Sequence, residues 1–175
     1  MRYKDQRVGI FIDVQNLYHS AKHLYSSRVN YKELLRFLLA GRNPIRIIGY
    51  VVKSEGIGGD NRPDASKSEK LFFDALEKAG VELRSKDLQI YPGGLKKADW
   101  DVGLAVDAIR MASALDVVIL VTGDGDFVPL VEYLKWGLGR QVEIAGFSRS
   151  ASAKLKDSAD LFLNIEEIPK ILIRK

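Results

Sequence analysis

Two aspartates, separated by one glycine, stand where a strand should give way to a helix. Asp124 and Asp126 follow the apolar run Val117 to Val121, which is typical of a buried parallel strand. An amphipathic helical pattern starts directly after them, at Phe127. In open α/β sheets such a turn lies at the carboxyl edge, where ligands bind. A purely structural role is the alternative, with Asp126 as the helix cap and Asp124 as a turn residue.

A third carboxylate, Asp13, ends the apolar run Arg7 to Asp13, which predicts the first strand. Asn16 falls in the first turn of the helix that follows. It could bind the same ligand, orient Asp13 or simply start the helix. His19 and His23 lie one helical turn apart. We expect them to be surface or partly buried residues, because no third nitrogen ligand accompanies them.

A fourth carboxylate, Asp101, opens a helix that we expect to run from Asp99 to about Ser113. A helical wheel places Asp101 near the middle of the inward arc. That arc contains Val102, Ala105, Ile109 and Ala112, and it is widened by Leu104, Ala108 and Met111. A carboxylate on a buried face needs a metal, a lysine or backbone N–H groups as a partner. The same wheel puts Asp107 on the polar side beside Arg110, where it would face solvent.

The remaining pattern alternates strands with helices. Further strands are expected at 45–52, 81–83, 141–147 and 161–165, and further helices at 31–39, 65–79 and 166–173. Such alternation predicts a Rossmann-like three-layer α/β/α sandwich with a mostly parallel sheet, formed by one domain over residues 1–175. The segment 54–66, with three glycines, is expected to be either a lid or a disordered loop.

Composition limits the kind of metal that the acids could hold. The chain has no cysteine and two histidines, which excludes thiolate sites and leaves hard oxygen ligands. Such ligands favour magnesium (Mg²⁺) or manganese (Mn²⁺). No stretch approaches the ~18 apolar residues of a membrane span. The sequence therefore predicts a soluble, cytoplasmic protein that does not enter a membrane.

A mildly basic balance, with a net charge of +4 and a pI of about 9.2, is weak evidence for a polyanionic partner. Lys96 and Lys97 follow a turn that contains Tyr91, in the densest basic stretch. They could hold phosphates while Tyr91 stacks on a base, although a solvated loop is equally consistent. Ser148 and Arg149 follow the strand 141–147, on the same edge as the acids.

Four converging carboxylates with few nearby cations make a site for one or two divalent ions, which activate water and stabilise charge at phosphorus. Other phosphoryl-transfer sites fit less well. A haloacid dehalogenase-type phosphatase needs Asp-x-Asp after the first strand, but Gln15 stands at the second position after Asp13. Neither GxGxxG after the first strand nor a Walker A sequence occurs. A topoisomerase–primase domain is the closest rival, yet it expects glutamate where the chain has Asp13.

The segment TGDGDFVPLV, with Asp13 and Asn16 after the first strand and Asp101 and Asp107 in the later helix, resembles the NYN domain. More narrowly, it is similar to the LabA-like branch of the PIN-like nuclease superfamily, over roughly residues 7 to 165. The resemblance implies a PIN-like fold and metal-dependent cleavage of RNA. The metal ligands that it implies are Asp13, Asp101, Asp124 and Asp126. The supporting polar residues are Asn16, Thr122, Ser148 and, ranked below the four ligands, Asp107.

The predicted function is thus a Mg²⁺- or Mn²⁺-dependent ribonuclease. Its expected RNA-binding residues are Lys96, Lys97, Arg149 and Tyr91, although the family's lysine lies three residues before the acid, where this chain has Ala98. A regulatory module of the same fold that binds RNA or protein with little turnover is the alternative, since intact ligands do not guarantee a positioned substrate. A homodimer is compatible with a domain of this size, but no residue specifies one.

Overall fold

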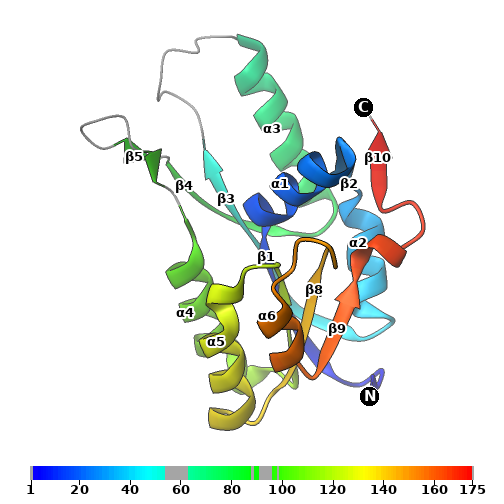
Figure 1. Ribbon diagram of the computed structural model, residues 1–175, viewed down its shortest axis with the longest axis vertical. Helices are drawn as coiled ribbons and strands as arrows, with labels where there is room; N and C mark the ends of the chain where they lie inside the picture. The colour runs from blue at the N-terminus through cyan, green and yellow to red at the C-terminus, as the bar shows by residue number, and fades with distance from the viewer. Residues whose placement is uncertain (1, 54–62, 88, 91–95, 98, 175) are drawn as a thin grey trace.

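The computed structural model of the protein describes residues 2–53, 63–87, 89–90, 96–97 and 99–174 (Figure 1). For residues 63–66, 89–90 and 96–97 it describes the backbone alone. Most of the expected loop 54–66 and the turn around Tyr91 therefore lie outside the described residues, as do the side chains of Lys96 and Lys97. Within the described ranges, no helix is both long and apolar enough to span a lipid bilayer.

Six parallel strands form the central sheet, in the order β4-β3-β1-β7-β8-β9 (Figure 1). Their bounds are β1 (Arg7–Asp13), β3 (Asn43–Lys53), β4 (Glu82–Asp87), β7 (Val117–Val121), β8 (Gln141–Gly146) and β9 (Leu161–Asn164). Every residue of β7 is buried, as a central strand covered on both faces requires. The predicted α/β fold with a mostly parallel sheet is confirmed.

Helices cover both faces of this sheet (Figure 1). One face carries α1 (Val14–Tyr25), α2 (Tyr31–Leu39) and α3 (Pro63–Lys78), and the other carries α4 (Asp101–Met111), α5 (Val128–Glu132) and α6 (Ala153–Ser158). Alternate residues of β1 point to opposite faces. Accordingly Ile10 packs in the core of the first layer and Phe11 in the core of the second. The result is the expected α/β/α sandwich.

Shorter elements complete the chain. They are β2 (Ser27–Val29), β5 (Gln89–Ile90), β6 (Lys96–Lys97), β10 (Leu172–Arg174), the 3₁₀ turns η1 (Ala112–Ala114), η2 (Gly125–Phe127) and η4 (Ile165–Glu167), and the π turn η3 (Tyr133–Gly137). The antiparallel pairs β10–β2 and β5–β6 form two small sheets.

The predicted helix 166–173 is wrong. The chain makes only the short turn η4 and then the strand β10, which pairs antiparallel with β2. Pro169 disfavours a helical conformation at the residue before it, and Lys170 adopts a left-handed φ of 60°. These two residues end the helical path, while Ile168 and Ile171 turn into the core.

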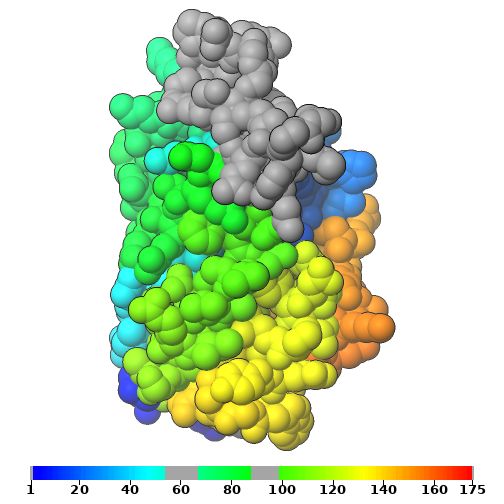
Figure 2. Space-filling view, turned by 90° about the vertical axis from the view of Figure 1, so that its left-hand side faces the viewer, coloured from blue at the N-terminus to red at the C-terminus, as the bar shows by residue number. Residues whose placement is uncertain are grey.

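The predicted inward arc of α4 is wrong in part. Val102 is 74% exposed and Ile109 is exposed, although both are expected to face inward. Leu104, Ala108 and Ala112 are buried as expected, and Asp107 is buried against expectation. Figure 2 looks onto the face where α4 and the segment 128–137 lie side by side. A helical wheel treats all apolar residues alike and contains no information on contacts with other elements. The wheel therefore predicts that Asp107 faces solvent, although Asp107 has a hydrogen-bond partner on another element.

A buried ion pair ties α2 to the sheet. Both terminal nitrogens of Arg42 donate to the Glu143 carboxylate, at 2.7 and 2.9 Å. The same guanidinium donates to the carbonyl oxygens of Leu38 and Leu39, at 2.6 and 3.1 Å. The side chains of Arg42 and Glu143 are 1% and 0% exposed. Each charge is therefore compensated inside the core rather than by water.

Candidate functional site

The first carboxylate, Asp13, lies where β1 passes into α1. Its Oδ1 accepts a hydrogen bond from the backbone N–H of Asn16, at 3.0 Å, and so caps the helix. Its Oδ2 accepts from the hydroxyl of Thr122, at 3.2 Å. Strands β1 and β7 are parallel neighbours, with Ile12 opposite Val121. The ends of the two strands therefore place Asp13 and Thr122 side by side.

The turn after β7 is held by the same polar residues. The backbone N–H of Gly123 donates to Asn16 Oδ1, at 3.0 Å, and that of Asp124 donates to Thr122 Oγ1, at 3.2 Å. Asp124 Oδ1 then accepts from the backbone N–H of Asp126, at 2.9 Å. Asp124 is thus the cap of η2, in place of the Asp126 cap considered from the sequence. Asn16 and Thr122 fix the position of the acids around them.

The third acid reaches this edge from the opposite layer, at the start of α4. No side chain caps this helix, but the preceding Trp100 is held firmly. Its Nε1 donates to the carbonyl oxygen of Val51, at 2.8 Å, and its ring centroid lies 5.4 Å from that of Tyr50. A Cβ on Gly103 would lie 2.5 Å from the indole, so glycine is needed there. The anchored Trp100 thereby sets the position of Asp101.

These elements enclose a pocket of about 270 Å³. Its lining residues are Asp13, Gln15, Asn16, His19, Ser20, Tyr50, Asp99, Trp100, Asp101 and Asp124. Three of the four predicted metal ligands are therefore brought together. Asp126 is exposed next to the pocket and does not line it.

Two other predicted site residues lie away from the pocket lining. The backbone N–H of Ser148 donates to Asn164 Oδ1, at 3.4 Å, and the Arg149 guanidinium sits 6.0 Å from the centre of the Tyr25 ring. Neither side chain lines the pocket. The predicted substrate residues Lys96, Lys97 and Tyr91 have no described side chains.

Asp107 supports the pocket wall from behind. It is 7% exposed, which corrects the solvent-facing position expected from the sequence. The hydroxyl of Tyr50 donates to Asp107 Oδ2 at 2.9 Å, and Arg84 Nε lies 3.5 Å from the same oxygen. Burial and the neighbouring Asp107 carboxylate raise the pKa of Tyr50, which keeps its hydroxyl protonated as a donor. Asp107 therefore holds in place an aromatic ring that lines the site.

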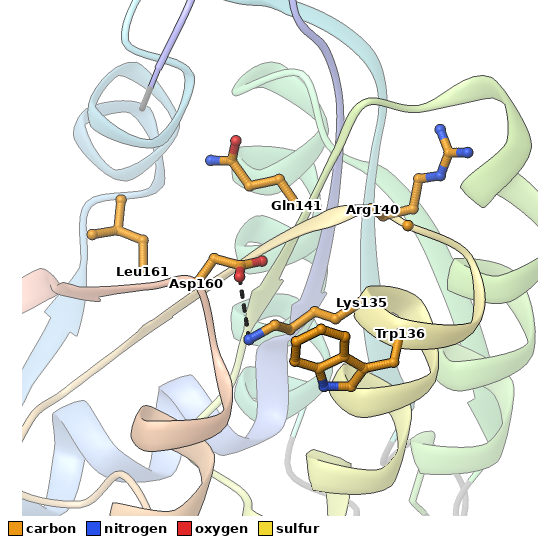
Figure 3. A pocket seen from close by; sticks show the side chains of 7 residues that line it. Lys135, Trp136, Arg140, Gln141, Asp160 and Leu161 are labelled. Carbon is orange, nitrogen blue, oxygen red and sulfur yellow. Dashed lines mark ion pairs between the residues drawn. The ribbon is translucent and has the colours of Figure 1, made fainter.

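A larger hollow of about 470 Å³ lies at the opposite, amino-terminal edge of the sheet (Figure 3). Its lining is Lys135, Trp136, Gly139, Arg140, Gln141, Asp160 and Leu161. It contains one carboxylate, Asp160, which pairs with Lys135 Nζ at 3.2 Å. Size alone would favour this hollow, but a single neutralised carboxylate does not make a divalent-metal site.

A concentration of carboxylates distinguishes the smaller pocket. Burial and the charges of Asp13, Asp99, Asp124 and Asp126 raise the pKa of Asp101 to about 6. Burial also raises the pKa of Asp13. Among the residues that the structure describes, no three Asp, Glu or His side chains are arranged to hold a metal ion. The donor set nevertheless fits Mg²⁺ or Mn²⁺, because a bound cation would relieve this repulsion and both ions prefer carboxylate oxygen.

The raised pKa of Asp101 predicts a loss of stability as the pH rises. An aspartate carboxyl in an unfolded chain titrates near about 3.9. Because its folded pKa of about 6 is higher, the folded protein holds the proton more tightly. The stabilising contribution is complete below about pH 4 and is lost as the pH rises through about 6. Above that range the ionised carboxylate repels its neighbours, so the Asp101→Asn variant should be more stable than the wild type.

Urea unfolding in EDTA measures this effect. At about pH 7.5 we expect Asp101→Asn to unfold at a higher urea concentration than the wild type, and at about pH 4 we expect the difference to vanish. Asp157→Asn is the matched control, since Asp157 is exposed on α6 and outside the pocket. An equal difference at both pH values would contradict the assigned repulsion.

The chain matches a known protein family over most of its length. The sequence model of the NYN domain matches residues 7–166. The chain belongs to the NYN domain family. The match includes all four predicted ligand positions, so the pocket lies within the NYN domain.

Two known proteins match this chain over nearly its whole length. The "Low amplitude and bright protein LabA" of Synechococcus elongatus is 23% identical over 176 residues, which cover 96% of this chain and 88% of that protein. A crystal structure of a protein of unknown function from Vibrio parahaemolyticus superposes with a TM-score of 0.84 and 31% identity. That alignment covers 99% of this chain and 100% of the other.

The lining residues that sequence reasoning missed include three with ring side chains: His19, Tyr50 and Trp100. A signal existed for two of them. His19 lies three residues after Asn16, which is one helical turn and the same face. Trp100 directly precedes Asp101. Tyr50 gave no signal, because its position depends on how β3 pairs with β1.

Proposed function

We propose that this NYN domain is a Mg²⁺- or Mn²⁺-dependent ribonuclease that hydrolyses RNA phosphodiester bonds. The observation that carries the proposal is the meeting of three carboxylates from separate elements in one pocket, namely Asp13, Asp101 and Asp124. Burial and the neighbouring carboxylates raise the pKa of Asp101, and a divalent cation would neutralise the negative charge that these acids bring together. RNA is the substrate that membership of the NYN family implies.

The acids and Thr122 have distinct parts in this proposal. Asp13, Asp101 and Asp124 would hold the cation, and the exposed Asp126 would act through water. When bound, Mg²⁺ or Mn²⁺ activates water and stabilises the charge that develops at phosphorus. Thr122 keeps Asp13 oriented through the hydrogen bond to Oδ2. Water attacks in line with the departing oxygen, so no protein nucleophile is required.

One observation favours a second candidate. Within the described parts of the chain, no three acidic or histidine side chains are already arranged around a common metal position. A domain in which these side chains never close around an ion would bind RNA or a protein partner without turnover. This regulatory binding module is the alternative to the ribonuclease.

Cleavage of a labelled RNA of mixed sequence separates the two candidates. With Mn²⁺ the wild type should convert the RNA to shorter products, and EDTA should stop the reaction. RNA that stays intact with Mn²⁺ and Mg²⁺, while a folded wild type still binds it, would overturn the ribonuclease proposal and favour the binding module.

A further inference from the structure

The carboxylates that line the pocket repel the negative charge of an RNA phosphate. The lining contains four carboxylates, from Asp13, Asp99, Asp101 and Asp124. Among the described lining residues, one side chain can carry a positive charge, and that is His19. A bound cation would neutralise part of the acidic charge, but the phosphate also needs a hydrogen-bond donor from the protein.

His19 is well placed to be that donor. It lies on α1, one turn after Asn16, so both face the pocket, together with Ser20. The opposite side of α1 is fixed in the core by Leu17 and Ala21. The imidazole itself is exposed and touches the edge of the Tyr18 ring, with 5.5 Å between the centroids. A rigid helix therefore presents His19 at the mouth of the pocket, where a polymer can reach it.

Three described cations lie near the pocket without lining it. The ammonium of Lys86 donates to the carbonyl oxygen of Asp99 and lies over the Trp100 ring. Lys22, one turn further along α1, has its ammonium 5.8 Å from the centre of the Tyr18 ring. Arg149 lies over Tyr25. In contrast, His19 lines the pocket itself.

We propose that His19 binds a non-bridging phosphate oxygen of the RNA through an imidazole N–H, and so positions the strand against the wall formed by α1. This inference rests on the proposed function, because it takes RNA as the ligand. His19 is a substrate-positioning residue here and takes no part in bond breaking. A charge-assisted hydrogen bond from an imidazolium to a phosphate is stronger than one between neutral groups.

Three variants test this role. His19→Gln removes the charge, His19→Lys restores a permanent one, and His23→Gln is the matched control, since His23 is exposed on the same helix and does not line the pocket. Binding is measured by fluorescence anisotropy of a labelled single-stranded RNA. Ca²⁺ replaces Mn²⁺, because it accepts the same oxygen ligands with looser geometry. Cleavage with Mn²⁺ then gives kcat and KM.

We expect His19→Gln to weaken RNA binding about tenfold, the loss of one hydrogen bond to a charged group. KM should rise by a similar factor while kcat changes less than about twofold. The lost contact stabilises the bound substrate and the transition state equally, so its removal affects KM and not kcat. His19→Lys should restore most of the affinity, which a merely structural role of His19 would not produce. His23→Gln should bind like the wild type.

Equal binding by His19→Gln and His23→Gln would overturn the proposal, as would a failure of His19→Lys to restore affinity. Absence of RNA binding by the wild type would overturn it as well. If the wild type binds RNA but never cleaves it, the ribonuclease proposal fails, and the binding comparison among the three variants still decides the role of His19.

Discussion

Replacing Asp124 with asparagine should reduce RNA cleavage at least about 100-fold, since even residues that only support metal ligands typically cost 10- to 100-fold. The fold should survive. Asp124 Oδ1 caps η2 by accepting from the N–H of Asp126, and asparagine keeps an oxygen that can accept the same bond. The substitution removes the negative charge and one carboxylate oxygen from the pocket lining.

Initial rates with Mn²⁺ measure this effect, and circular dichroism checks the fold. Asp157→Asn is the control, because it removes one negative charge from the exposed surface of α6 without touching the pocket. It should cleave at the wild-type rate. Wild-type cleavage by a folded Asp124→Asn variant would show that the reaction occurs elsewhere on the molecule.

Replacing Arg42 with methionine should lower the free energy of unfolding by about 3 kcal/mol, the usual cost of leaving one charge of a buried pair unpaired. Glu143 would keep its contacts with Gln141 Nε2, at 2.9 Å, and with Arg2, at 3.4 Å. We therefore expect a loss at the lower end of the usual ~3–5 kcal/mol. The carbonyl oxygen of Leu38 would also lose the guanidinium as a donor, whereas that of Leu39 would keep the backbone N–H of residue 42, at 2.9 Å.

Urea unfolding near neutral pH measures this loss. The exposed pair of Arg46 and Glu82, 41% and 47% exposed, provides the control. Arg46→Met should cost less than about 1 kcal/mol, as surface ion pairs do. Combining Arg42→Met with Glu143→Leu should recover most of the loss, since apolar replacements of buried pairs are often neutral. Similar costs for Arg42→Met and Arg46→Met would show that Arg2 takes over the role of Arg42.

Local sequence patterns predicted the elements that bring the acids together. Asp13 and Asp124 each follow an apolar strand, and parallel strands deliver their carboxyl ends to one edge. The pattern could not show what meets a residue from another layer. Asp107 looked solvent-facing because its donor, Tyr50, comes from β3. Trp100 became an anchor because Val51 offered it a carbonyl oxygen. Such contacts depend on tertiary packing, which no single helix or strand contains.

The packed core of this chain extends beyond the residues that the NYN model matches. The NYN match ends at residue 166, yet Ile168 and Ile171 are buried in the core of the α1–α2 layer. The backbone N–H of Asn30 also donates to the carbonyl oxygen of Ile171, at 2.7 Å. A chain that ended at residue 166 would retain every candidate site residue. It would lose Ile168 and Ile171 from the core of that layer. The NYN match and the packed core therefore end at different residues, and only the core includes Ile168 and Ile171.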